Sequence, residues 1–103
     1  MKATLPLIMG LTLLGCANVS SVPGADAVRL IDAAEAQGCQ RVGSANAQVA
    51  DKIAFVERDE KKVAEELLAL ARNEAVKLGG DSLVIDSAIK FGSRRFVVYR
   101  CQS

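Results

Sequence analysis

The clearest pattern of apolar and polar positions lies between residues 59 and 78. Asp59 is placed to cap the start of a helix, and Glu60 and Lys77 carry the charges that the two ends of a helix dipole favour. Gly79-Gly80 supplies the left-handed residue that ends many helices. Apolar side chains recur at the three- and four-residue spacing of one helical face: Val63, Leu67, Leu70, Ala71, Ala75 and Leu78. The pattern predicts one long helix over Asp59–Leu78.

Shorter apolar segments on both sides of this helix predict strands. Leu83 and Ile85 alternate on one face of the segment after the helix, and Gly43 indicates a bulge or a close approach by another part of the chain. Phe91–Arg94 is expected to form a turn. The expected extended segments are Val28–Leu30, Cys39–Val49, Ser82–Ile89 and Phe96–Cys101.

The order of these elements is strand, strand, helix, strand, strand. It predicts an α+β domain in which a small antiparallel sheet packs on one long helix (β-β-α-β-β). Two segments fit more than one structure. Asp32–Gly38 suits a helical turn or a loop, and Asp51–Arg58 suits a strand end or a packed loop.

A separate apolar run lies at the N-terminus. It follows Lys2 and extends from Leu5 to Leu14, with the small Gly15 after it. A basic start, an apolar middle and a small residue before the cut are typical of a secretion signal. The run has only about ten residues, against roughly 20 that a membrane-spanning helix needs. We therefore expect residues 1–15 to be a cleaved signal peptide. The alternatives are a short membrane helix and an ordinary secretion signal followed by an incidental cysteine.

The residues Leu13-Leu14-Gly15-Cys16 resemble the lipobox of bacterial lipoproteins. The resemblance implies that Cys16 is lipidated and becomes the first residue after cleavage. Two or more acyl chains hold a protein on a membrane almost permanently. Ala17 stands where an Asp would resemble an inner-membrane retention signal. We therefore expect an anchor in the bacterial outer membrane, with the rest of the chain facing the periplasm.

These signals divide the chain into three parts. Residues 1–15 are the expected signal peptide, and residues 16–25 the lipidated cysteine with a flexible tether. The tether is small and polar and is broken by Pro23-Gly24, a composition typical of linkers. Residues 26–103 are expected to form a single α+β periplasmic domain.

Charge and composition argue against several classes of function. Removing residues 1–15 from the 103-residue chain leaves 88 residues, and because Lys2 is the only charge removed, 12 basic and 12 acidic side chains remain. This balance gives no electrostatic footprint for nucleic acid. The chain has no histidine, which excludes Ser–His and Cys–His catalysis and removes the commonest metal ligand. We expect no enzyme activity, no cofactor and no metal site.

Two cysteines remain once Cys16 is assigned to lipid. Cys39 and Cys101 form an even pair, which in an oxidising compartment favours a disulfide. Such a bridge would close a loop of about 62 residues and stabilise the domain by roughly 4 kcal/mol in the chain-entropy model. The alternatives are a metal pair and a redox pair. Two sulfurs without histidine make a poor metal site, and redox pairs usually lie close in sequence as Cys-x-x-Cys.

Several of these motifs together resemble one family of small bacterial lipoproteins, that of domain of unknown function 4156. They are the lipobox, Gly38-Cys39 with Gly43, Ala71–Ala75 leading into Leu78-Gly79-Gly80-Asp81, and Tyr99-Arg100-Cys101. The resemblance covers roughly residues 26–103. It implies the α+β fold, the Cys39–Cys101 bridge and a likeness in fold to the Rcs stress-sensing outer-membrane lipoprotein. It carries over no catalytic residue. The Rcs sensor has a second disulfide, for which this chain has no cysteines.

Three side chains are candidates for contact with a partner. Asn73 lies near the helix end, where an Asn also commonly bonds to nearby loop backbone. Arg94-Arg95 is the one compact basic spot, suited to peptidoglycan carboxylates or lipid phosphates, or else simply a solvated turn. Asp81 and Asp86, five residues apart around a strand, are expected to point to opposite faces rather than to act as a carboxylate pair.

Two kinds of function remain. The first is a lipid-anchored, non-enzymatic envelope lipoprotein that binds another envelope protein or contributes to the envelope stress response. The alternative is a small-molecule or metal-binding module, assembled as an oligomer with its site between subunits. The membrane is the expected partner through lipid on Cys16, and the oligomeric state stays open.

Overall fold

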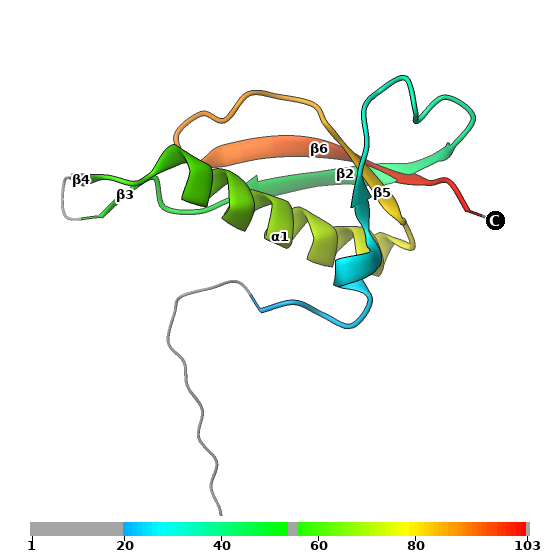
Figure 1. Ribbon diagram of the computed structural model, residues 1–103, viewed down its shortest axis with the longest axis horizontal. Helices are drawn as coiled ribbons and strands as arrows, with labels where there is room; N and C mark the ends of the chain where they lie inside the picture. The colour runs from blue at the N-terminus through cyan, green and yellow to red at the C-terminus, as the bar shows by residue number, and fades with distance from the viewer. Residues whose placement is uncertain (1–19, 54–55, 103) are drawn as a thin grey trace, which may run out of the picture.

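The computed structural model describes residues 20–53 and 56–102 (Figure 1). The helix α1 lies along one face of a sheet, and a small hairpin extends beyond the sheet near the start of α1. Among the described residues, no helix is long and apolar enough to cross a membrane. The elements are the 3-10 helix η1 Ala25–Ala27, β1 Arg29–Leu30, β2 Gln40–Gln48, β3 Lys52–Ile53, β4 Val56–Glu57, α1 Glu60–Leu78, β5 Ser82–Ile85 and β6 Ser93–Arg100.

The main sheet has four strands in the order β1-β5-β6-β2. The pairs β2·β6 and β5·β6 are antiparallel, so the predicted α+β domain with a sheet packed on one helix is confirmed. One pair differs from the predicted antiparallel arrangement, because the two-residue β1 pairs in parallel with β5. These two strands are separated along the chain by β2 and α1, so no hairpin connection forces them to run in opposite directions.

The two segments that the sequence left open have definite structures. Within Asp51–Arg58, β3 and β4 pair as an antiparallel hairpin, with Lys52 opposite Glu57. The segment Asp32–Gly38 forms turns rather than a helix. The side chains of Asp32 and Glu35 each accept a hydrogen bond from the other residue's main-chain N–H, which stabilises the first of these turns.

Both ends of α1 are as predicted. Asp59 is the N-cap, and its carboxylate accepts a hydrogen bond of 3.0 Å from the main-chain N–H of Lys61. Gly79 ends the helix with a left-handed φ of 79°, and the N–H of Gly80 donates to the carbonyl of Ala75. Gly80 has no room for a side chain, because an added Cβ would overlap Val98.

The core lies between α1 and the sheet. Its largest fully buried apolar side chains are Phe96, Leu67, Leu83 and Val98. The helical stripe predicted from the sequence is buried at Val63, Leu67, Ala71 and Ala75. Leu78 at the end of the stripe is 37% exposed and lies against Gly43. Ile85 is 42% exposed and lies at the end of β5, beyond the residues that pair with β1.

The last strand is longer than predicted and its turn lies one residue earlier. Lys90 and Ser93 exchange main-chain hydrogen bonds of 2.9 and 3.0 Å. Phe91 and Gly92 between them both have positive φ, of 50° and 73°, which is the geometry of a type I′ hairpin turn. Arg94 and Arg95 therefore belong to β6 and not to the turn, and they pair with Ala47 and Asn46 of β2.

The predicted disulfide is present. Cys39 and Cys101 are bonded, with their Cα atoms 4.4 Å apart. They lie immediately beyond the end of the β2·β6 ladder, whose outermost pair is Gln40 with Arg100. The ladder also contains the irregularity that Gly43 predicted, because the register shifts between Arg41 and Gly43.

Candidate functional site

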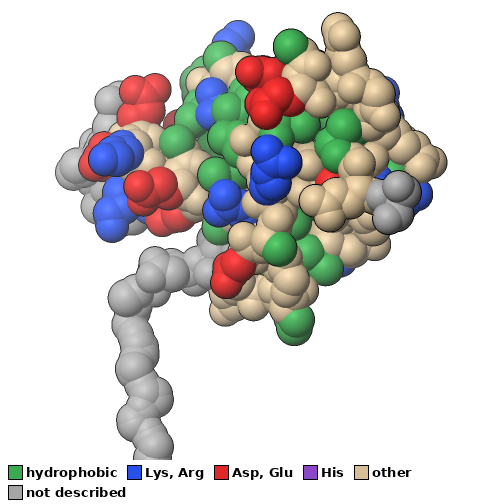
Figure 2. All heavy atoms as spheres, turned by 45° about the vertical axis from the view of Figure 1, so that its right-hand side comes forward, with side chains coloured by type: hydrophobic (Ala, Val, Ile, Leu, Met, Phe, Trp, Pro, Cys, Tyr) green, Lys and Arg blue, Asp and Glu red, His purple; other side chains and the backbone are tan. Residues whose placement is uncertain are grey.

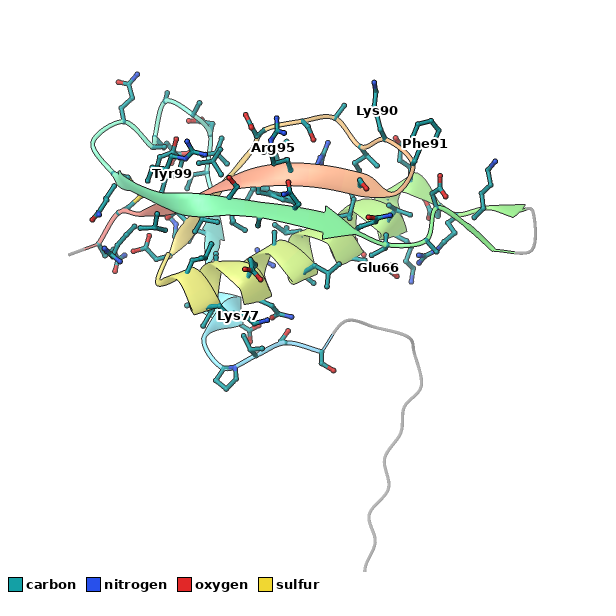
Figure 3. All side chains as sticks on the ribbon, turned by 180° about the vertical axis from the view of Figure 1, so that it is seen from behind. Glu66, Lys77, Lys90, Phe91, Arg95 and Tyr99 are labelled. Atoms are coloured by element: carbon teal, nitrogen blue, oxygen red, sulfur yellow. A yellow bond between two sulfur atoms is a disulfide. The ribbon has the colours of Figure 1, made fainter. Side chains whose placement is uncertain are left out.

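An open depression of about 610 Å³ lies where β2, β6 and the irregular β5–β6 connection meet. In Figure 3, Lys90, Phe91 and Arg95 lie on one side of β6, and Glu66 and Lys77 of α1 lie on the other. The residues that line the depression are small, uncharged and polar, or basic: Asn46, Ala47, Gln48, Ser87, Ala88, Lys90, Ser93, Arg94 and Arg95.

The two arginines predicted as partner contacts hold the β5–β6 connection in place. Arg95 donates from Nε to Asp86 Oδ2 at 2.9 Å, and its main-chain N–H donates to Ser87 Oγ at the same distance. Arg94 donates from Nε to the carbonyl of Ser87 at 2.9 Å. Among the described residues, no hydrogen bond engages the Nη atoms of Arg94. The structure thus places both arginines and Lys90 in the lining of one depression. Asp86 forms an ion pair with Arg95.

The charge of this depression differs from that of the chain as a whole. Figure 2 shows basic and acidic side chains interspersed on the face it presents, in keeping with the balanced composition. The lining of the depression, in contrast, contains three cations and no carboxylate, and of these cations Arg95 is paired with Asp86 beside the lining. Its amide and hydroxyl side chains can donate further hydrogen bonds. The arrangement is suited to an anionic group, and particularly to a carboxylate or phosphate.

Phe91 lies in this region and was not predicted from the sequence as a candidate functional residue. Its side chain is 85% exposed at the tip of the turn, and its backbone has a φ of 50°. A positive φ is unfavourable for a bulky residue, so this position combines backbone strain with an exposed aromatic ring. The sequence predicted a turn here. An aromatic residue next to a glycine in that turn was the only available signal.

Asn73 lies on α1 and does not belong to the depression. Its Oδ1 accepts a hydrogen bond of 3.0 Å from the N–H of Val22, and its Nδ2 donates to the carbonyl of Ser20 at 2.7 Å. It therefore binds loop backbone, but of a segment more than 50 residues away. Arg72 Nε donates to the carbonyl of Val28 at 3.1 Å, so two neighbouring residues of α1 hold the N-terminal segment.

These contacts begin inside the part of the chain expected to be a flexible tether. Ala25, the last residue of that expected tether, is only 2% exposed and starts η1. Cys16 and the signal peptide lie outside the described residues. The described part of the tether is thus hydrogen-bonded to α1 at Ser20 and Val22 and becomes buried at Ala25.

Asp81 and Asp86 have separate partners, as expected from their spacing. Asp81 Oδ1 accepts from the N–H of Cys101 and from Ser82 Oγ, and its Oδ2 accepts from the N–H of Gln102, at 2.9 to 3.0 Å. Burial opposes the charged form of Asp81, but these hydrogen bonds outweigh it and leave its pKa below the ordinary value. The carboxylate thereby holds the C-terminal segment beside the disulfide.

A two-pronged ion pair joins Arg58 to α1. Arg58 Nη1 lies 2.9 Å from Glu66 Oε1, and Nη2 lies 2.6 Å from Oε2. Nη1 also donates to the carbonyl of Ala50 at 3.0 Å. The hydrogen bonds from Arg58 lower the pKa of Glu66 despite partial burial. The pair connects the chain around the β3–β4 hairpin to α1. It was not predicted, because the two residues are eight positions apart on either side of the helix start and no local pattern links them.

Within residues 20–53 and 56–102, no group of three or more His, Cys, Asp or Glu side chains is arranged to hold a metal ion.

Comparisons with known proteins give a family but no characterised relative. Neither the curated proteins nor the solved structures provide a significant match to this chain. The family model for a domain of unknown function, DUF4156, matches residues 19–101. This match includes the disulfide, α1, all four strands of the main sheet and the depression. The chain therefore belongs to the family of domain of unknown function 4156.

Proposed function

We propose that the chain is a lipid-anchored, non-enzymatic binding module of the bacterial cell envelope, held in the outer membrane by lipid on Cys16 and facing the periplasm. The observation that carries this proposal is the Cys39–Cys101 disulfide. Disulfides persist in oxidising compartments such as the periplasm. The bridge thus agrees with the export signal and the Leu13–Cys16 motif, which stand in an unrelated part of the sequence.

The packing of the N-terminal segment adds a geometric consequence. Asn73 binds the backbone at Ser20, so only four peptide units separate that point from Cys16. Four residues span at most about 14 Å even when fully extended. A lipid on Cys16 would therefore hold α1 close to the membrane surface. The depression, which lies across β6 from Lys77 of α1, would face away from the lipid.

The charge of the depression supports a binding role. Lys90 and the Nη atoms of Arg94, which have no hydrogen-bond partner within the described part of the chain, are placed for a carboxylate or phosphate group of another envelope component. Phe91 adds an exposed aromatic contact beside them. Exposed ion pairs are individually weak, so this surface suits a reversible interaction. Such an interaction fits either assembly of the envelope or a contribution to its stress response.

Lipidation is tested by a single substitution in cells that make the full chain. The native chain is expected to incorporate radiolabelled palmitate and to fractionate with the outer membrane, and Cys16→Ala is expected to lose both properties. Cys39→Ala is the matched control, because it removes a cysteine and the disulfide but leaves the lipid site. Equal labelling of the native chain and Cys16→Ala would contradict the proposed anchor.

A further inference from the structure

A second open depression, of about 600 Å³, lies between β2 and the side of α1. We call it the β2–α1 slot. Figure 1 shows α1 running along β2 over most of the strand. One wall is formed by Ser44 to Gln48 of β2. The other wall is formed by residues of α1 at helical spacing: Leu70, Ala71, Asn73, Glu74 and Lys77.

The strand wall presents unpaired main-chain groups. β2 ends the strand order and pairs only with β6 among the described strands. The N–H of Val49 donates to Gly92 on the β6 side, and the carbonyls of Arg95 and Tyr99 face the other way, toward β5 and the segment before it. Since main-chain direction alternates along an antiparallel pair, the N–H and C=O groups of Ser44, Asn46 and Gln48 point away from β6. They form a row of three donors and three acceptors.

From Ser44 to Gln48, the strand itself lacks three features that proteins use to protect edge strands. Such edges are commonly blocked by charged side chains, proline or bulges. The register shift of β2 lies near its start, between Arg41 and Gly43, and the pairing from Ser44 to Gln48 is regular. The exposed side chains of this regular part are Ser44, Asn46 and Gln48, which are uncharged. A row of main-chain groups of this kind is complementary to one ligand chemistry, that of another extended chain.

The position of α1 indicates whether the added strand comes from a second copy of this chain or from another protein. α1 packs more extensively against β2 than against β6 or β5. Small side chains cause this, because Ala45 and Ala47 face the helix on β2 whereas the larger Phe96 and Leu83 fill the space under β6 and β5. Paired strands lie about 4.8 Å apart, but packed helices need about 8–10 Å. Pairing β2 with β2 of a second copy would crowd the two α1 helices together.

The helix wall indicates the side chains that a single strand would carry. Leu70 and Ala71 are apolar, Glu74 lies one turn further along α1, and Lys77 another turn. One helical turn is about 5.4 Å and two strand residues are about 6.6 Å, so alternate residues of a paired strand match successive turns. Because β2 and α1 run in opposite directions (Figure 1), an added strand antiparallel to β2 would run in the same direction as α1. To complement the apolar, acidic and basic side chains along the helix wall, such a strand would carry the pattern apolar-x-basic-x-acidic.

We propose that the β2–α1 slot binds an extended segment of another protein by strand addition, with main-chain hydrogen bonds to Ser44, Asn46 and Gln48. This inference rests on the proposed role as a binding module and names the class of partner. It assigns a contact that differs from the cationic depression in its chemistry, although Asn46, Ala47 and Gln48 line both.

The test separates main-chain from side-chain effects at Asn46. Asn46→Pro removes an outward-pointing N–H that β6 does not use, and proline is tolerated on an edge strand in that position. Asn46→Ala is the matched control, because it removes the side chain and keeps the N–H. Ser44→Pro and Ser44→Ala form a second pair, used if Asn46→Pro fails to accumulate as a folded, disulfide-bonded protein.

The readout is photocrosslinking in intact cells that make the full chain as two differently tagged copies. The photoreactive amino acid benzoylphenylalanine stands at position 77. Because the probe replaces Lys77, we expect adducts mapped by mass spectrometry to an extended segment with the apolar-x-basic part of the pattern, both with Asn46 in place and in Asn46→Ala. Loss of one main-chain hydrogen bond predicts about tenfold fewer adducts in Asn46→Pro.

Three results would overturn strand addition: equal adducts in the Pro and Ala variants, adducts only between the two tagged copies, or no adduct from position 77. None of these results depends on palmitate labelling at Cys16. Failure of the slot and failure of the proposed lipid anchor are therefore distinguishable.

Discussion

The two ends of the β2·β6 ladder are built differently. At one end, the Cys39–Cys101 disulfide lies against the last strand pair, and Asp81 binds the main chain just after Cys101. At the other end, the Lys90–Ser93 turn exposes Phe91 and borders an open depression. A chain of 88 residues after the expected cleavage has a small core. The disulfide and the hydrogen bonds of Asp81 stabilise one end, which leaves the other end free to display strained and charged groups.

Removal of the disulfide is expected to have the largest effect on this contrast. The bridge closes a separation of 62 residues, for which the chain-entropy model gives about 4 kcal/mol. Cys39→Ala with Cys101→Ala should lower the free energy of unfolding by about that amount, measured by urea unfolding. Addition of a reductant to the native chain should have the same effect. Identical unfolding curves with and without reductant would show that the disulfide end is not the stabilising end.

A methyl group at Gly80 is the next largest change. Its Cβ would overlap Val98 and approach the carbonyl of Tyr99, neither of which can move without disturbing β6. Overpacking of this kind typically costs about 2 kcal/mol, so Gly80→Ala should lower the melting temperature by several degrees. Ala88→Gly in the β5–β6 connection is the control at the open end, where a smaller loss is expected. An unchanged melting temperature for Gly80→Ala would contradict the close packing described for this end.

Asp81 makes the disulfide end sensitive to acid. Because its pKa in the folded state lies below the ordinary value, the stability it contributes is present above about pH 4 and is lost as the pH falls through the lower folded pKa. Asp81→Asn should therefore be less stable than the native chain at neutral pH, and the difference should shrink on acidification. The measurement is the free energy of unfolding of both proteins from pH 7 to pH 2. A difference that stays constant over this range would exclude the carboxylate as its source.

The smallest effect is expected at the turn and has the opposite sign. Asn adopts positive φ more readily than Phe does, so Phe91→Asn should relieve backbone strain and stabilise the protein by about 1 kcal/mol. Phe91→Ala removes the same exposed ring without relieving the strain and serves as the control. Calorimetric melting curves compare the two. Destabilisation by Phe91→Asn would mean that the ring packs against the domain, contrary to its exposure.

The features predicted correctly from the sequence depend on local patterns or on counting. The periodic stripe of α1, the Asp59 cap and the Gly79 stop each lie within a few residues of the groups they act on. The disulfide followed from having two cysteines left over. The pairing of β1 with β5 and the hydrogen bonds between Asn73 and the main chain of Ser20 and Val22 join segments about 50 residues apart. No local pattern carries that information.

The candidate surfaces show the same limit. Arg94-Arg95 stood out in the sequence as a basic pair, but its neighbours Lys90 and Asn46 come together only through the β2·β6 register. The β2–α1 slot is even less visible, because its strand wall consists of main-chain groups whose direction depends on that register. The residues with distinctive side chains were predictable as candidates, whereas the surfaces that combine them were not.

The central claim is that this disulfide-bonded domain is anchored by lipid in the envelope. The most direct measurement is the intact mass of the full-length product, purified from the membrane fraction without reductant. The account predicts a chain that begins at an acylated Cys16 and gains two mass units on reduction of Cys39–Cys101. A mass that retains residues 1–15, or that begins at an unmodified Cys16, would contradict it.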